Sequence, residues 1–241
     1  MPDRRRHRGP HPEDRRLFAA RSHPALRRAV AELSWLLGRG YAEPSSLKLV
    51  GDRYQLHARQ RLAVMRSSCS DAQRLGRLAR RVEPAAVAGR AILIDGYNVL
   101  TSLEAALAGG VLLRGRDRCV RDLASMHGSY RKVAETVPAL AAAGEVLAEL
   151  GGAGATWLLD RPVSNSGRLK KIIETVAADR GWAWQVEIVT DPDALLRRHD
   201  GLIATADGPV LDAGAAWVNL APRVIAAMDA EPRWVDLDAS A

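Results

Sequence analysis

Three aspartates each end, or shortly follow, an apolar run in the second part of the sequence. They are Asp95 after residues 91–94, Asp160 after residues 155–159, and Asp207 shortly after residues 201–205. Short apolar runs between turn signals are typical of buried strands in a parallel sheet. Because the carboxyl ends of such strands lie along one edge, where ligands bind, we expect the three carboxylates to converge.

Converging carboxylates repel one another, and burying them without a partner costs still more free energy. A hard divalent cation such as Mg²⁺ or Mn²⁺, which prefers oxygen ligands, removes this conflict. Such an ion can activate water and stabilise a phosphoryl oxygen, as phosphodiester hydrolysis requires. Asp95, Asp160 and Asp207 are therefore the candidate metal-binding and catalytic residues.

Each of these aspartates also has an ordinary structural explanation. Asp95-Gly96 is compatible with a turn, Asp160 with the approach to a helix, and Asp207-Gly208 with a turn or a helix N-cap. Three aspartates that all lie at strand ends are less easily explained by chance, so the pattern favours a functional site.

A second segment has features of a phosphate site. Ser164, Asn165 and Ser166 are predicted to open a helix, with Arg168 and Lys170 just inside it. The free N–H groups and the dipole of a helix N-terminus attract anions. Simple capping of the helix by Ser164 or Ser166 explains the same pattern.

Residues 127–131 supply two further candidates for handling phosphate. His127 could serve as a proton shuttle or a phosphate contact, and Arg131 could hold a phosphate through two hydrogen bonds. A lone histidine in such a loop is more often structural. The sequence contains no P-loop, zinc-protease or hydrolase-elbow motif.

Elements that position these residues follow an alternating pattern of strands and helices, which predicts an α/β class with a parallel sheet flanked by helices. The predicted strands are 91–94, 155–159, 183–189, 201–205 and 215–220. The predicted helices are 132–150, 164–180 and 223–228.

The first 90 residues differ in charge from the rest, with 20 Lys and Arg against 8 Asp and Glu in a chain of net charge +7. We expect a basic flexible arm (1–15), a basic helical module with a hairpin around Gly51-Asp52 (16–88), and the α/β domain (89–241). Such asymmetry suggests that the basic part meets a polyanion, although a basic surface that only aids solubility is the alternative.

Composition narrows the class of protein further. There is no apolar run long enough to span a membrane, and no apolar segment follows the charged N-terminus as in a secretory signal. Cys69 and Cys119 form no metal-binding pair, which argues against structural zinc and fits a reducing compartment. We therefore expect a cytoplasmic protein. Because aromatic residues are 5% of the chain, a nucleic-acid surface would depend on arginine more than on stacked aromatic rings.

The sequence Ile-Asp-Gly-Tyr-Asn-Val-Leu at residues 94–100 resembles the opening strand and turn of NYN-type members of the PIN superfamily. Residues 158–160 and 205–207 are similar to the later acidic strand ends of that fold. The chain as a whole resembles an uncharacterised prokaryotic family in which a basic N-terminal domain of unknown function precedes a PIN-like domain. That wider resemblance is carried by residues 127–131, 160–167 and 205–212.

This resemblance implies a PIN-like (Rossmannoid) fold and metal-dependent hydrolysis of RNA. It implies Asp95, Asp160 and Asp207 as metal ligands, with Asn98 close by. Asp212 is either a fourth acid or the cap of the next helix. PIN domains also place an acid on an intervening helix, and here Asp117, Asp122 and Glu135 compete for that role. The long segment between residues 100 and 130 departs from the simplest PIN layout.

The leading hypothesis is a Mg²⁺- or Mn²⁺-dependent endoribonuclease whose basic N-terminal part holds the RNA. Two alternatives stay open: a non-catalytic RNA-binding protein with a degenerate PIN-like domain, and an α/β phosphohydrolase acting on a small nucleotide or phosphate ester. The RNA target, the choice between RNA and DNA, and the oligomeric state, a homodimer included, are not determined by the sequence.

Overall fold

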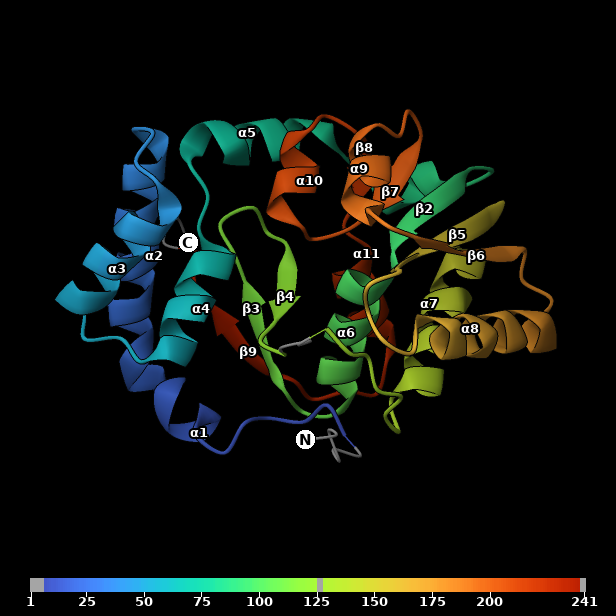
Figure 1. The fold of residues 1–241 in the computed structure, drawn as a ribbon, viewed down its shortest axis with the longest axis horizontal. Helices are drawn as coiled ribbons and strands as arrows, with labels where there is room; N and C mark the ends of the chain where they lie inside the picture. Colours follow the sequence, from blue (N-terminus) through green and yellow to red (C-terminus); the bar gives the residue numbers. More distant parts are fainter. Residues whose placement is uncertain (1–6, 125–127, 239–241) are drawn as a thin grey trace.

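A six-stranded parallel sheet dominates the second part of the computed structural model, which describes residues 7–124 and 128–238 (Figure 1). In spatial order the strands are β1 (Arg81–Val82), β8 (Ala216–Val218), β7 (Leu202–Ala204), β2 (Ala91–Asp95), β5 (Gly154–Asp160) and β6 (Trp184–Val189). The predicted parallel sheet flanked by helices is confirmed. The edge strand β1 was not predicted, because two residues are too short for a periodic signal.

Side chains from alternate residues of the sheet enter two different cores. Ile92 and Ile94 of β2 pack in the larger core, whereas Leu93 packs beside the smaller one. The larger core includes residues of α6 (Gly96–Leu107), α7 (Thr136–Glu149), α8 (Ser166–Arg180) and α11 (Leu220–Ala227). The smaller core includes residues of α9 (Pro192–Arg197) and α10 (Gly208–Asp212). Both faces are therefore covered, which is why the strands are apolar runs rather than alternating patterns.

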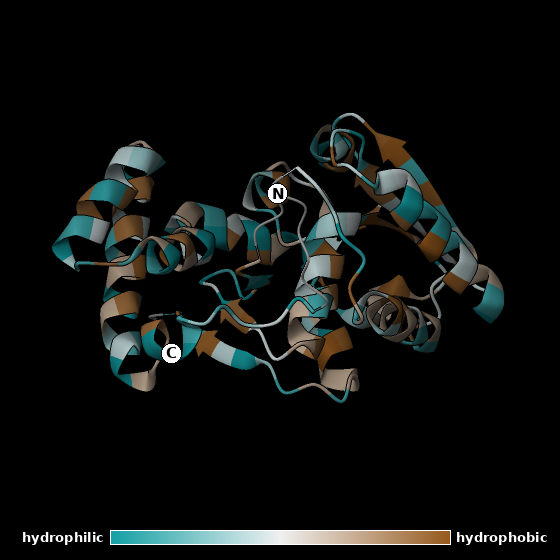
Figure 2. Cartoon of the chain, turned by 60° about the horizontal axis from the view of Figure 1, so that its bottom comes forward, coloured by the Kyte–Doolittle hydropathy of each residue, from teal (hydrophilic) through white to brown (hydrophobic). Residues whose placement is uncertain are grey.

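Helices make up most of the N-terminal region. They are α1 (Asp14–Leu17), α2 (His23–Gly38), α3 (Glu43–Arg53), α4 (Ala58–Ser67) and α5 (Asp71–Arg80), with short 3-10 turns at Ala20–Ser22 and Pro84–Val87. Hydrophobic and hydrophilic residues alternate along these helices, as expected where one face is buried (Figure 2). No helix in the described part of the chain is long and apolar enough to cross a membrane.

The predicted hairpin around Gly51-Asp52 is wrong, because α3 continues through both residues. Buried Ser46 and Val50 lie one turn apart, and Lys48 forms an ion pair with Asp52 (2.8 Å) at the i, i+4 spacing of a helix. A glycine suits this position because the guanidinium of Arg61 packs where a Cβ would lie. Tertiary packing therefore overrides the local turn signal.

A second, three-stranded sheet joins the N-terminal helices to the rest of the chain (Figure 1). Its strands, in order, are β4 (Val120–Asp122), β3 (Val111–Arg114) and β9 (Arg233–Asp236). Leu113 and Val235 of this sheet share a hydrophobic core with Leu26 and Leu33 of α2. The segment between residues 100 and 130 and the last strand thus complete the core of the N-terminal region.

Within the expected flexible arm, residues 7–15 are largely exposed, but Arg8 and Asp14 are buried against the rest of the protein. Arg8 is buried and donates to the carboxylate of Glu104, which is 0% exposed and also accepts from Tyr130 and Thr136. Asp14 is likewise buried and pairs with Arg59 (2.5 Å). These ion pairs to buried partners hold residues 7–15 against the protein, although the basic composition of the segment predicts a solvated arm.

Replacing Arg8 with alanine is expected to lower the free energy of unfolding by about 2 kcal/mol, because Glu104 loses its cation. Burial raises the pKa of Glu104, and Arg8 opposes that rise. A folded-state pKa above the unfolded value means that stability falls as pH rises through it. Urea unfolding at pH 5 and pH 8 should therefore show the larger loss at pH 8. Arg15→Ala, at an exposed position of α1, is the control, and an equal loss at both pH values would contradict the expectation.

Candidate functional site

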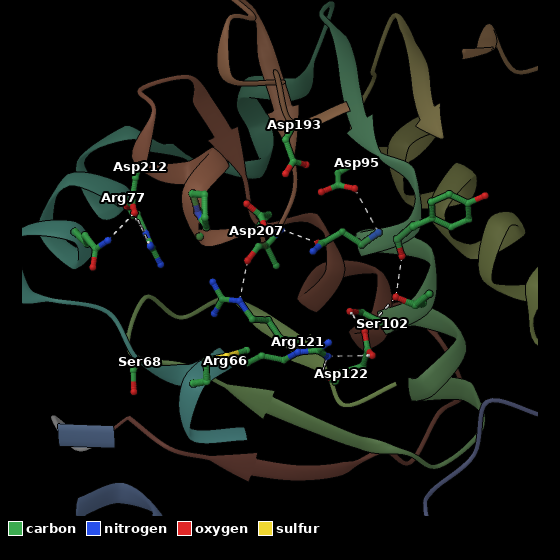
Figure 3. A pocket seen from close by; sticks show the side chains of 18 of the residues that line it. Arg66, Ser68, Arg77, Asp95, Ser102, Arg121, Asp122, Asp193, Asp207 and Asp212 are labelled. Carbon is green, nitrogen blue, oxygen red and sulfur yellow. Dashed lines mark hydrogen bonds and ion pairs between the residues drawn. The ribbon is translucent and has the colours of Figure 1, made fainter. Parts of the chain in front are cut away.

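A cleft of about 820 Å³ lies between the N-terminal helices α4 and α5 and the carboxyl ends of the large sheet (Figure 3). Its acidic lining residues are Glu43, Asp95, Asp122, Asp160, Asp193, Asp207 and Asp212. Its basic lining residues are Arg66, Arg77 and Arg121. The cleft therefore holds both signs of charge.

The strand register brings the three predicted aspartates into this cleft. In β2, Ile94 lies opposite Ala204 of β7, and Asp95 lies opposite Leu158 of β5. Asp160 therefore ends β5 two residues beyond the partner of Asp95, and Asp207 follows the end of β7 by three residues. The hydroxyl of Thr205, beside Asp95 in this register, donates to the Asp95 carboxylate (2.7 Å).

Two of these aspartates also cap helices. The Asp95 carboxylate accepts from the N–H of Asn98 (3.4 Å) at the start of α6, and that of Asp207 accepts from Val210 (3.0 Å) at the start of α10. Asn98 lines the cleft, and its side-chain oxygen accepts from the N–H of Ala206 (2.8 Å). Asp95 and Asp207 therefore cap helices and also line the cleft. The side chain of Asn98 fixes the loop that carries Asp207.

Sequence reasoning missed Asp193, which lies beside Asp95 and Asp207 at the acidic end of the cleft (Figure 3). The signal was present, because β6 is followed by Asp191-Pro192-Asp193 at the same sheet edge. The same sequence also has a structural role, because Asp191 caps α9 by accepting from Ala194 (2.8 Å).

Burial and mutual repulsion disfavour the charged forms of these carboxylates. Burial, with the nearby charges of Asp207 and Asp193, raises the pKa of Asp95 to about 7. Burial also raises the pKa of Asp193, with Asp207 as the next contributor, and burial raises the pKa of Asp160. Carboxyl groups that are costly to ionise indicate a site that favours a cation.

Ion pairing divides the cleft acids into two groups. Within the described residues, none of Asp95, Asp160, Asp193 and Asp207 forms an ion pair. Asp212 accepts from Arg77 Nε (2.7 Å) and Nη2 (2.9 Å), and also from Gln73 (2.8 Å). The candidate fourth acid therefore already has partners.

The three residues considered for the additional acid lie in different environments. Asp122 lines the cleft and accepts from Ser102 (2.9 Å) and the N–H of Ala124 (2.6 Å). Asp117 is buried in ion pairs with Arg77 and Arg121, outside the cleft lining. Glu135 accepts from His7 (2.6 Å) beside the N-terminal segment. Of the three, only Asp122 lies in the cleft.

Three of the predicted phosphate residues, Arg131, Asn165 and Arg168, line a separate hollow of about 200 Å³. Ser166 begins α8, but its hydroxyl is buried against Tyr97 (2.7 Å). Because Tyr97 lines the cleft, Ser166 lies just behind the cleft wall.

Two of the other predicted phosphate residues, Ser164 and Lys170, already have protein partners. Ser164 pairs through its backbone with Gly128 and Tyr130. Lys170 donates to the carbonyl of Val186 (2.8 Å). His127 lies outside the described residues.

The carboxylate oxygens at the acidic end are the kind of ligand that Mg²⁺ or Mn²⁺ prefers. They do not surround a metal ion completely. Among the residues that the structure describes, no three His, Cys, Asp or Glu side chains are grouped so as to hold a metal ion. Mg²⁺ usually keeps several waters and needs only one or two protein carboxylates plus substrate oxygens. Unpaired carboxylates beside an open cleft meet that requirement.

Comparisons with known proteins divide the chain into two matched regions. A family model described as "Protein of unknown function (DUF434)" matches residues 25–80. An uncharacterized protein of Methanocaldococcus jannaschii is 28% identical over 187 residues, covering 78% of this chain and 89% of that protein. No solved structure matches the chain significantly. The model described as "Domain of unknown function (DUF5616)" matches residues 84–223, more than half of the chain, and the chain belongs to that family.

Proposed function

We propose that this protein is a metal-dependent ribonuclease of the PIN/NYN type, with a PIN-like α/β domain and its centre at the acidic end of the cleft. One observation carries the proposal. Asp95, Asp160, Asp193 and Asp207 line the same end of the cleft, and none forms an ion pair within the described residues. Grouped anions without a protein cation favour an external one.

In this proposal one or two of Asp95, Asp193 and Asp207 would bind Mg²⁺ or Mn²⁺ directly, the others would bind its water ligands, and Asp160 completes the acidic edge. The ion, when bound, supplies charge neutralisation at the phosphate and a more acidic water for phosphodiester hydrolysis. Thr205 and Asn98 fix the positions of Asp95 and of the Asp207 loop by the hydrogen bonds described above. RNA as the substrate and a cytoplasmic location are parts of the same proposal.

Arg121 adds a fixed positive charge near Asp207. Its Nε donates to the carbonyl of Ala206 (2.7 Å), and Nη1 and Nη2 donate to Asp117 (2.9 and 2.6 Å). A guanidinium held at three nitrogens cannot swing towards the aspartates. Its charge is therefore paired with Asp117 and does not neutralise the acidic end.

Asp95→Asn is expected to reduce Mn²⁺-dependent RNA cleavage on the order of a thousandfold, because several kcal/mol of transition-state stabilisation depend on the metal. The measurement is Mn²⁺ titration calorimetry together with cleavage of a mixed RNA pool by both proteins. Asp179→Asn, which removes the same charge at an exposed position of α8, should leave both unchanged.

Two results would replace this proposal. RNA binding without metal-dependent cleavage by the wild type would indicate a non-catalytic RNA-binding protein. Metal-dependent turnover of nucleotides or small phosphate esters, with RNA left intact, would indicate a phosphohydrolase. Cleavage that persists in Asp95→Asn would remove this acidic edge from the mechanism.

A further inference from the structure

The cleft has a second wall, which the N-terminal region supplies. The lining residues from α4 and the connection to α5 are Met65, Arg66, Ser68 and Ser70. In Figure 3, Arg66 lies across the cleft from Asp95 and Asp193. Asp95 and Asp193 therefore face a wall that offers a guanidinium and two hydroxyl groups. Glu43 and Asp122, which contacts Arg66, also line the cleft.

Arg66 is loosely held compared with the other arginines of the cleft. Its Nη1 donates to the carbonyl of Asp122 (2.5 Å) and lies 3.7 Å from the Asp122 carboxylate. That carboxylate already accepts from Ser102, Thr101 and the N–H of Ala124. Arg66 is therefore not required to satisfy the hydrogen bonding of Asp122.

The donors of Arg66 also remain available. Within the described residues, its Nε and Nη2 have no hydrogen-bond partner. Its side chain is 29% exposed and lines the cleft. Arg77 and Arg121 differ, because all three nitrogens of each guanidinium are bonded to protein oxygens. Two adjacent free N–H groups match the geometry of a phosphate.

The size of the cleft admits a short strand as well as a single small molecule. A cleft of about 820 Å³ is near the upper end of the roughly 300–1,000 Å³ typical of pockets for small ligands. The cleft is also lined by Leu37, near the end of α2, and by Glu43, at the start of α3. More than one nucleotide unit therefore fits between the acidic end and the N-terminal wall.

We propose that Arg66 binds a backbone phosphate of a nucleic-acid strand whose neighbouring phosphodiester lies at the acidic end. The inference rests on the proposed function and assigns to the N-terminal region one wall of the substrate site. Arg66 supplies attraction that needs no metal, whereas the acidic end repels phosphate until a cation is present.

Arg66→Gln is therefore expected to bind a fluorescein-labelled, single-stranded 12-nucleotide RNA about tenfold more weakly, measured in EDTA by fluorescence anisotropy. One lost phosphate contact should also make the slope of log K against log salt shallower by about 0.7. Arg66→Lys should keep the slope. The matched control is Arg28→Gln, at an exposed position of α2 outside the cleft lining, which should bind within about twofold of the wild type.

A second variant guards against a folding defect in Arg66→Gln. Met65→Glu leaves the Arg66 hydrogen bond to Asp122 in place and puts a carboxylate on the same wall, so it should also weaken binding. Melting temperatures within a few degrees of the wild type would show that both variants are folded. Unchanged affinity in both variants would overturn the inference.

Binding in EDTA separates this inference from the nuclease proposal. Arg66-dependent binding without cleavage in Mn²⁺ would retain the contact and reject the nuclease. Cleavage with no Arg66 effect on binding would retain the nuclease and reject the contact. If adenosine monophosphate competes with the labelled RNA as well as the unlabelled 12-nucleotide strand does, the occupant of the cleft is not a strand.

Discussion

Replacing Arg77 with methionine is expected to lower the melting temperature by roughly 10 °C, which corresponds to about 3 kcal/mol in a chain of this size. Arg77 is buried on α5 and donates to Asp117 (2.7 Å) as well as to Asp212. Its carbonyl also accepts from the indole of Trp217 (2.7 Å). Removing the guanidinium leaves two carboxylates with fewer partners, one of them fully buried.

The loss should depend on pH. Burial acts to raise the pKa of Asp117, but the guanidinium groups of Arg121 and Arg77 lower it well below its usual range. A depressed folded-state pKa gives stability that is present above the unfolded pKa and is lost as pH falls below it. The difference between wild type and Arg77→Met should therefore be complete at neutral pH and shrink below about pH 4.

Arg74→Met is the matched control, because Arg74 lies one turn earlier on α5 and its Nε has no hydrogen-bond partner within the described residues. Calorimetric melting at pH 7 and pH 3.5 compares the three proteins. Equal melting temperatures for Arg74→Met and Arg77→Met would contradict a stabilising role for the ion pairs of Arg77.

The guanidinium of Arg77 also lies where a Cβ on Gly208 would be (2.9 Å). The Arg77→Met variant should therefore also disturb the turn that follows Asp207.

Asp95→Asn is expected to stabilise the protein at pH 8 by up to about 4 kcal/mol when no divalent cation is present. Burial, with Asp207 and Asp193, raises the pKa of Asp95 from 3.8 to about 7. The folded state therefore binds this proton more tightly than the unfolded chain, and stability falls as pH rises from about 4 to about 7. The amide removes that charge and can still accept from Thr205.

Urea unfolding at pH 4 and pH 8 measures this effect. The variant and the wild type should be equally stable at pH 4 and should differ at pH 8. Mn²⁺ should stabilise the wild type and leave the variant unaffected, since a ligand of the folded state alone raises its stability. Asp179→Asn serves again as the control, and a gain that is the same at both pH values would exclude the raised pKa as its cause.

The charge asymmetry of the sequence has a partly internal explanation. Arg8, Arg66 and Arg77 from the basic part pair with Glu104, Asp122, Asp117 and Asp212 from the acidic part. The surplus that suggested a polyanionic partner is therefore used in part to join the two regions. Net charge is therefore a weak argument for nucleic-acid binding. The free Nε and Nη2 donors of Arg66 are a stronger one.

The sequence by itself determined the parallel α/β sheet and the strand ends that carry Asp95, Asp160 and Asp207. Runs such as 91–94 are apolar throughout because both faces of the sheet are buried, and that signal is local. The sequence did not determine α3, the edge strand β1 or the second sheet. Those elements depend on contacts between residues far apart in the chain, which override local turn and linker signals.

Only the tertiary structure decided which charged residues share the cleft. It placed Asp193 beside Asp95, paired Asp212 with Arg77, and set Arg131 and Arg168 around a different hollow. A carboxylate at a strand end has the same local sequence whether or not an arginine from another helix reaches it. Pairing and burial arise from long-range packing, and they separate the aspartates without an ion pair from those that hold the fold together.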